Sequence, residues 1–282
     1  MDKQLDNKFE DSFLPMTSLG SGLGISVLPD IFCYTNKIVN LCFVGDPEKQ
    51  EGFFLIDAGM PKNADEIMEA AAERYGKGKA PKAIILTHGH FDHVGSLVEL
   101  LDHWNVPVYA HSLEMPYLTG KANYPPGDST IDEGLVGEMS PLFPNHGIDL
   151  GEKVQALPED GSIPGMTGWK WIHTPGHSSG HISLFRESDR ALIAGDAFVT
   201  VKQESLYKVL TQKKEISGPP KYFTPDWRSA YESVEKLKSL NPSVAATGHG
   251  QPMAGEELSE ALNYLVNNWS EIGLPEHGKY LD

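Results

Sequence analysis

Residues 83–95 read Ala83-Ile84-Ile85-Leu86-Thr87-His88-Gly89-His90-Phe91-Asp92-His93-Val94-Gly95. The first four residues are apolar and predict a buried strand. Three imidazoles and a carboxylate follow within six residues, and these groups bind divalent metal ions better than they pack. His88 and His90 are two residues apart and can face one ion, whereas the adjacent Asp92 and His93 can face a second. The spacing therefore suggests two metal ions.

The composition indicates a globular protein. The chain has 282 residues, of which 40% are hydrophobic, enough for a sizeable core. No linker or low-complexity stretch divides it, so we expect a single domain over residues 1–282.

The charge balance limits the classes of molecule that the protein is expected to bind. A formal net charge of −16 is opposite to the basic surface that nucleic-acid binding requires. The sequence has no run of eighteen apolar residues, the length that would indicate a membrane-spanning helix. We expect a small-molecule substrate, with neither nucleic acid nor membrane as a partner.

Two features favour a cytoplasmic location. The first residues are charged and lack the apolar core of a secretory signal. Cys33 and Cys42 are the two cysteines, and both lie in apolar, strand-like settings typical of reduced core thiols.

Strand and helix patterns alternate along the chain. We expect strands at 24–34, 38–44 and 52–56, followed by a helix at 61–75 and a second helix at 94–104. The further strands expected are 83–86, 106–110, 154–157, 170–173, 182–185, 190–194 and 243–246, with helices at 225–240 and 256–269. The alternation predicts a layered α/β protein in which the histidine stretch joins a strand to a helix.

Other candidate site residues also stand at expected strand ends. They are Asp57, His177, Asp196 and His249. Taken singly, each is a weak signal, because Asp and His at strand ends are more often turn or surface residues.

In this order, the motifs resemble those of the metallo-β-lactamase-fold hydrolases over nearly the whole chain. The resemblance implies an α/β fold, a four-layer αβ/βα sandwich whose two halves meet at the site. It also implies a ligand set: His88, His90 and His177 for one ion, Asp92, His93 and His249 for the other, and Asp196 bridging both.

Catalytic roles are expected for Asp92 and Asp57. Asp92 is a ligand that can also accept or relay a proton. By the same resemblance, Asp57 would stand behind the ligands and orient an imidazole or a backbone amide.

Nitrogen and oxygen donors without thiolate suit zinc, and also accept iron, manganese or cobalt. We therefore expect two divalent ions, with zinc preferred and iron or manganese as alternatives. Such ions would lower the pKa of a bound water from about 15.7 to about 7 and would polarise a carbonyl for its attack.

Positions at which the chain departs from particular branches of the family limit the expected substrate class. Asp196 replaces the Cys or Ser common in β-lactamases, and 33 residues after His249 (282 − 249) are too few for the helical region of glyoxalase II. Val199 stands where acyl-homoserine lactonases often carry a tyrosine. We expect hydrolysis of a small ester, lactone or thioester; the alternatives are a phosphodiesterase-type metallohydrolase and a non-catalytic metal-binding protein of the same fold.

Two irregular segments, residues 111–146 and 199–224, are the expected pocket walls. Tyr117, Tyr124 and Tyr222 are their candidate substrate contacts, and His181 is expected to be structural. Phe91 is left open between facing the pocket and bracing the loop. The physiological substrate, the native metal and the oligomeric state are not assigned.

Overall fold

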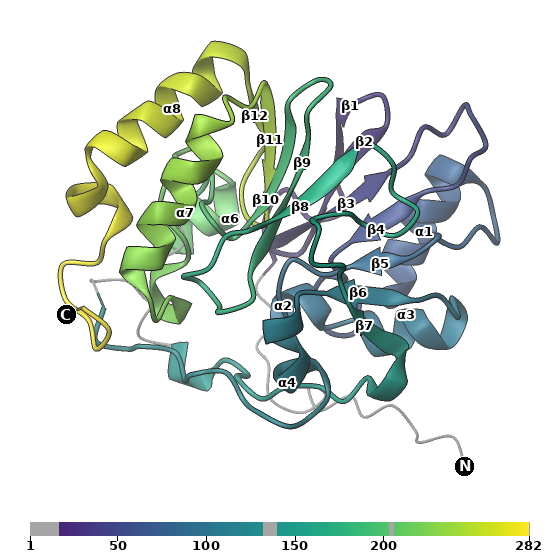
Figure 1. Cartoon of the computed structure of the whole chain (residues 1–282), viewed down its shortest axis with the longest axis horizontal. Helices are drawn as coiled ribbons and strands as arrows, with labels where there is room; N and C mark the ends of the chain where they lie inside the picture. The colour runs from purple at the N-terminus through teal and green to yellow at the C-terminus, as the bar shows by residue number, and fades with distance from the viewer. Residues whose placement is uncertain (1–16, 132–139, 203–205, 282) are drawn as a thin grey trace.

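Two β-sheets lie face to face between outer layers of helices (Figure 1). The computed structural model describes residues 17–131, 140–202 and 206–281. Residues 1–16, and parts of both expected pocket walls (132–139 and 203–205), lie outside the described residues. The four layers confirm the αβ/βα sandwich that the family resemblance implies.

The first sheet has seven strands in sequence order. They are β1 (Gly24–Leu28), β2 (Ile31–Asn36), β3 (Val39–Val44), β4 (Phe54–Ile56), β5 (Ile84–Ile85), β6 (Val108–Ala110) and β7 (Val154–Ala156). Strands β1 to β4 pair antiparallel, and β4 to β7 pair parallel. Because β4 and β5 are parallel, Asp57 and the histidine stretch emerge at the same edge of the sheet.

The second sheet has five strands in the order β12-β11-β10-β9-β8. They are β8 (Trp169–His173), β9 (Ile182–Arg186), β10 (Ala191–Gly195), β11 (Val244–Thr247) and β12 (Met253–Ala254). Strands β10 and β11 pair parallel, so the residues after them, Asp196 and His249, also lie close together at one edge.

Helices cover the outer face of each sheet (Figure 1). Against the first sheet lie α1 (Ala64–Tyr75) and α3 (Leu97–His103), and against the second lie α7 (Trp227–Ser239) and α8 (Gly255–Asn267). The remaining helical segments are α2 (Phe91–Val94), η1 (Ser112–Glu114), α4 (Met115–Leu118), η2 (Ser140–Leu142), η3 (Gly151–Lys153), α6 (Leu206–Thr211), η4 (Lys221–Phe223) and η5 (Trp269–Gly273).

Strand β3 shows how the sandwich is packed. Its residues are all buried, and they alternate between two hydrophobic cores. Val39, Leu41 and Phe43 belong to the core shared with α1 and α3, whereas Cys42 and Val44 belong to the core between the sheets. A third core lies between the second sheet, α7 and α8.

Three of the expected elements are wrong in detail. The strand expected at 24–34 is two strands, because Pro29 and Asp30 form a turn between β1 and β2, as these residue types favour. The segments 111–146 and 199–224 are not wholly irregular, since they contain η1, α4, α6 and η4.

The cysteines face each other across two strands. Cys33 in β2 and Cys42 in β3 are directly opposite in register, and both are free and buried. Among the described residues, no helix is long and apolar enough to cross a membrane.

Candidate metal centre

Titratable side chains from both sheets gather where their strands end. The loop after β5 and helix α2 contribute from the first half, and the ends of β10 and β11 and the loop between β8 and β9 contribute from the second. All of these side chains are buried. They are the predicted ligands His88, His90, Asp92, His93, His177, Asp196 and His249.

These side chains form three overlapping groups of possible ligands. One group is His88, His90 and His177; another is Asp92, His93 and His249; the third is His88, His93 and Asp196. Within each group the ligand atoms lie within 4.8 Å of one another. The structure thus brings the predicted residues together, and Asp196 reaches members of both predicted halves.

Unsatisfied buried atoms fit a metal at this place. In the described part of the chain, His88 Nε2, His93 Nε2 and Asp196 Oδ1 are buried and make no hydrogen bond. Buried polar atoms are normally paired, and an unpaired one calls for an explanation such as an ion. Nitrogen and carboxylate lone pairs converging in this way are a donor set suited to a divalent cation.

Four of the five imidazoles direct their other ring nitrogen to a protein oxygen. The pairs are His88 Nδ1 with Thr87 Oγ1 at 3.1 Å, His93 Nδ1 with Asp57 Oδ2 at 2.9 Å, His177 Nδ1 with Thr224 Oγ1 at 3.2 Å and His249 Nδ1 with the Ile38 carbonyl at 3.0 Å. Such contacts fix both the ring orientation and the tautomer. In each case Nε2 is the ring nitrogen left for the centre.

Asp57 holds the first half of the centre from behind. Its Oδ1 accepts from the Thr87 backbone N–H at 2.7 Å and its Oδ2 from the Thr87 hydroxyl at 2.8 Å, in addition to His93. Its φ of 63° lies in the left-handed region, which Asp tolerates better than most residues. Asp57 therefore acts through His93 and the backbone, and its role in catalysis remains a prediction.

The first group of histidines is electrostatically neutral. Burial lowers the pKa of His90 to about 4. Burial likewise holds the pKa values of His88 and His177 well below their usual range, and neighbouring histidines lower them further. All three are thus free bases near neutral pH, the form that binds metal.

The second group behaves in the opposite way. Burial lowers the pKa of His249, but Asp196 and Asp92 outweigh it and raise the value to about 10. The pKa of His93 is raised well above its usual range, because Asp196, Asp92 and Asp57 together exceed the effect of burial. Without metal, protons on these imidazoles balance the carboxylates.

Asp92 is the most exposed of the predicted ligands, at 8%. Its Oδ2 lies 3.4 Å from His249 Nε2. Burial raises its pKa, but His93 and His249 reverse the effect, so the carboxyl is ionised. Proton transfer remains the predicted role of Asp92.

His181 has a definite place behind the centre. Its Nε2 accepts the backbone N–H of Asp196 at 2.9 Å, so its Nδ1 carries the proton and faces the Thr174 carbonyl at 3.1 Å. Burial lowers the pKa of His181 to about 3, in keeping with this neutral tautomer. His181 thus holds the backbone of the predicted bridging ligand.

Sequence reasoning missed Glu114. It is fully buried and accepts hydrogen bonds from residues beside His88, His90 and His177. Its position in an aperiodic stretch carries no pattern. The indirect signals are Gly89 and Gly180, the two glycines that its side chain and that of Tyr124 approach.

Aromatic rings line one side of His90. The ring centroids of Tyr124 and Phe223 lie 4.4 and 5.0 Å from that of His90. The Tyr124 hydroxyl donates to Glu114, and its contact with a substrate stays a prediction. Phe91 is buried against Phe143 and Phe223, which makes it a brace for the loop.

The other two candidate tyrosines differ in position. Tyr117 stacks on Tyr124 with centroids 4.0 Å apart. Tyr222 is buried, with its ring 5.8 Å from that of Phe143. The partly exposed Phe223, which was not among the predicted contacts, has a ring that contacts His90. Tyr222 contacts Phe223 in turn.

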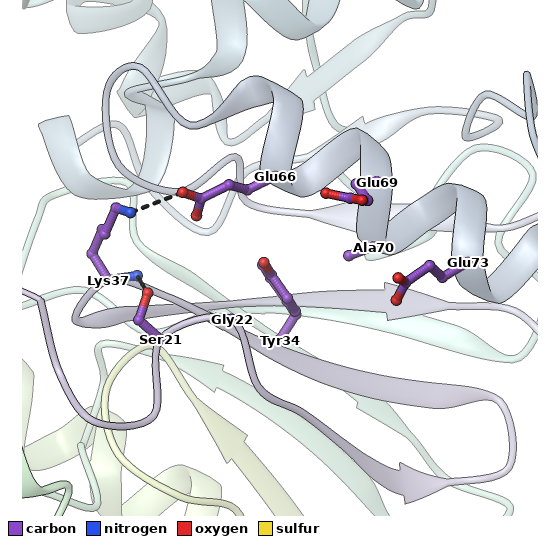
Figure 2. Close-up of a pocket in the computed structure, with 8 residues that line it drawn as sticks. All are labelled: Ser21, Gly22, Tyr34, Lys37, Glu66, Glu69, Ala70 and Glu73. Atoms are coloured by element: carbon purple, nitrogen blue, oxygen red, sulfur yellow. Dashed lines mark hydrogen bonds and ion pairs between the residues drawn. The ribbon is translucent and has the colours of Figure 1, made fainter.

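A separate cavity of about 320 Å³ lies between α1 and β2, away from these ligands. Figure 2 shows Glu66, Glu69 and Glu73 projecting from α1 toward the strand that carries Tyr34. Lys37 pairs with Glu66 at 2.9 Å. None of the predicted ligands lines this cavity.

Comparisons with known proteins identify the family and the fold. A model of the metallo-β-lactamase superfamily matches residues 33–249. The probable metallo-hydrolase YflN of Bacillus subtilis is 52% identical over 262 residues, which cover 93% of this chain and 99% of that protein. The chain therefore belongs to the metallo-β-lactamase superfamily of metal-dependent hydrolases.

Solved structures show the same architecture. A crystal structure of TTHA1623 in a di-iron-bound form is 26% identical, with a TM-score of 0.53, and the match covers 83% of this chain and 93% of that one. BJP-1, a subclass B3 metallo-β-lactamase of Bradyrhizobium japonicum, is 19% identical with a TM-score of 0.58, over 91% of this chain and 94% of that one. The second similarity concerns the fold alone.

Proposed function

We propose that this protein is a dinuclear metal-dependent hydrolase that cleaves a small ester, lactone or thioester. The observation that carries the proposal is the position of one oxygen. Asp196 Oδ2 lies 3.5 Å from His177 Nε2, 3.5 Å from His93 Nε2 and 3.3 Å from His249 Nε2. A carboxylate between both histidine groups is suited to join two ions.

In this proposal one ion would be held by His88, His90 and His177, and the other by Asp92, His93 and His249. Asp196 would contact both. Divalent ions held in this way would supply a bound water with a pKa of about 7 and a Lewis acid for a carbonyl oxygen. Asp92 would accept the proton released in the reaction, since its carboxylate is the least covered of the ligands. Asp57 keeps the ring of His93 oriented.

Zinc is the metal we propose, because five imidazoles and two carboxylates provide no thiolate and zinc accepts such mixed nitrogen and oxygen donors. Iron is the main alternative, supported by the di-iron form of TTHA1623. Manganese is the third.

A small, uncharged substrate fits the surroundings best. The formal net charge of −16 disfavours polyanions such as nucleic acids. Phe223 and the other rings beside His90 offer apolar contact to an acyl or aryl group. We extend the proposal to a cytoplasmic location, for which the two free, buried thiols are suited.

The test is a substrate panel of lactones, aryl esters, thioesters and phosphodiesters, with the metal content of each preparation measured. Protein loaded with zinc, iron or manganese should hold about two ions per chain and turn over a carboxylic substrate. Asp92→Asn has a side chain of the same size that cannot serve as the proton acceptor, and this variant should turn over the substrate more slowly.

Two results would redirect the proposal. Turnover of phosphodiesters alone would favour the phosphodiesterase alternative. Full metal content without turnover of any substrate would contradict the enzymatic function and favour a metal-binding protein of the same fold.

A further inference from the structure

Glu114, at the end of η1, has both carboxylate oxygens fully engaged. Oε2 accepts from the backbone N–H of Gly89 at 3.0 Å and from the hydroxyl of Tyr124. Oε1 accepts from the hydroxyl of Ser178 at 2.7 Å and from the backbone N–H of Gly180 at 2.9 Å. The side chain touches no predicted metal ligand through these bonds.

Three of the four donors, all except the Tyr124 hydroxyl, belong to two loops from opposite halves of the sandwich. Gly89 stands between His88 and His90 in the loop after β5, whereas Ser178 directly follows His177 in the loop between β8 and β9. One carboxylate therefore connects the loops that carry all three members of the first ligand group. Across this connection, His90 Nδ1 lies 2.9 Å from His177 Nε2.

The glycines on both loops are explained by this arrangement. A Cβ atom on Gly180 would lie 2.7 Å from Glu114 Cγ, and one on Gly89 would lie 2.5 Å from the Tyr124 hydroxyl oxygen. Either contact is too close for real atoms. The loops can approach the carboxylate only because neither residue has a side chain.

Burying a carboxylate is unfavourable unless its hydrogen bonds are replaced. Glu114 meets this condition with two backbone N–H groups and two hydroxyls. An apolar residue of similar size would fill the space but leave the N–H groups of Gly89 and Gly180 without these acceptors. The carboxylate is thus suited to fix geometry rather than to add packing.

We propose that Glu114 is a positioning residue that sets the spacing of His88, His90 and His177 by tying their two loops together. The inference rests on the proposed function in one respect, namely that these three histidines hold a metal ion. It adds a residue, distant in the chain from all of them, on which that ion depends.

The experiment measures metal binding rather than hydrolysis. His249→Ala is used as the background, because it breaks the second ligand group and leaves the first intact. In this background, Glu114→Gln should weaken Co²⁺ and Zn²⁺ binding by about tenfold or more, the range for groups that orient ligands. Competition with a chromophoric chelator gives the affinity, and the Co²⁺ absorption spectrum reports the ligand geometry, which should change.

Asp30→Asn is the matched control. Asp30 pairs with Arg186 and also links the two sheets, but at the end of β9 away from Asp196, since Arg186 is opposite Ala191 at the start of β10. This variant should lower the Tm while keeping the parental affinity and Co²⁺ spectrum. An equal loss of metal in Asp30→Asn would assign the effect to general destabilisation and overturn the inference.

A folded Glu114→Gln protein with the parental affinity and spectrum would also overturn it. If Glu114→Gln does not fold, Ser178→Ala removes one donor and Glu114→Asp shortens the reach. At least one of these should weaken binding, and parental affinity in both would contradict the inference.

The outcome is separable from that of the substrate panel. A wild-type protein that binds metal but hydrolyses nothing contradicts the proposed function and leaves the Glu114 inference standing. Wild-type protein that binds no divalent ion contradicts both.

Discussion

At the scale of single residues, Asp196 is the point at which both ligand groups meet. Its Oδ2 is within 3.5 Å of three imidazole nitrogens. Asp196→Ala should therefore lower metal content and activity together, and kcat/KM should fall by more than the 10- to 100-fold typical of outer contacts. Metal analysis and steady-state kinetics on the same preparation measure both. Wild-type rates with half the metal would show that one ion suffices.

The contrast in pKa between the two groups predicts a pH dependence of metal binding. His249, with its pKa raised to about 10, and His93 are protonated at neutral pH without metal, so an ion must displace those protons. The affinity of this group should rise with pH between 6 and 8, about tenfold per unit for each proton released.

The first group should behave differently. His90 has a pKa of about 4, and those of His88 and His177 are also low, so no proton is displaced above pH 6 and the affinity should change little. Calorimetric titrations at pH 6 and 8, in buffers of different ionisation enthalpy, would count the protons in each binding step. Equal pH slopes for both steps would contradict the prediction.

Residue types predicted the ligands better than their supports. His and Asp at strand ends are visible in the sequence, and their order along the chain indicated the whole set. Glu114 could not be identified in this way, because three of its four donors lie 25 and 64 to 66 residues away and a buried glutamate between two loops has no local pattern. The contact of His181 with the backbone of Asp196 could not be predicted from the sequence for the same reason.

At the scale of elements, the ends of β10 and β11 approach each other closely beside the centre. A Cβ on Gly248, directly after β11, would lie 2.0 Å from Asp196 Oδ1 and 2.8 Å from His93 Cε1. Gly248→Ala should therefore displace Asp196, cost about 1–3 kcal/mol of stability and lower the metal content. Chemical denaturation and metal analysis would measure the two effects.

Gly20→Ala is the control for this prediction. A Cβ there would meet its nearest atom at 3.4 Å, an ordinary contact, so stability and metal content should be unchanged. A Gly248→Ala protein with the wild-type metal content would show that the strand ends can separate without disturbing the ligands.

The sequence predicted strands correctly where apolar runs are long. The prediction of strand boundaries failed where the turn between two strands is short. The turn at Pro29 and Asp30 was absorbed into one long expected strand, because both flanking runs are apolar. Helix α6 was missed because its short sequence shows too few turns for a helical period to be recognised. Tertiary contacts, rather than local preference, settle such short elements.

At the scale of the whole molecule, the predicted ligands come from both halves of the sandwich. Ions bound there should stabilise the native state over the unfolded chain by about 4 kcal/mol at a thousandfold excess over Kd. Removing them with a chelator should lower the Tm by roughly 5–15 °C, which differential scanning calorimetry would measure. Restoring zinc should reverse the change, and an unchanged Tm would contradict a metal shared between the halves.

The layered architecture could be predicted because the residue pattern of each strand indicates which of its faces are buried. A strand such as β3, with apolar residues on both faces, must lie inside a sandwich rather than at its surface. The pairing of the two sheets could not be read from such patterns. It came from the family resemblance.

The facing thiols of Cys33 and Cys42 provide a probe of this architecture. They lie opposite each other in the core between the sheets, 2% and 3% exposed. An alkylating reagent can reach them only when this core opens. The rate of their modification would therefore report how often the two sheets part, and a bound metal ion should slow that rate from the far side of the same core.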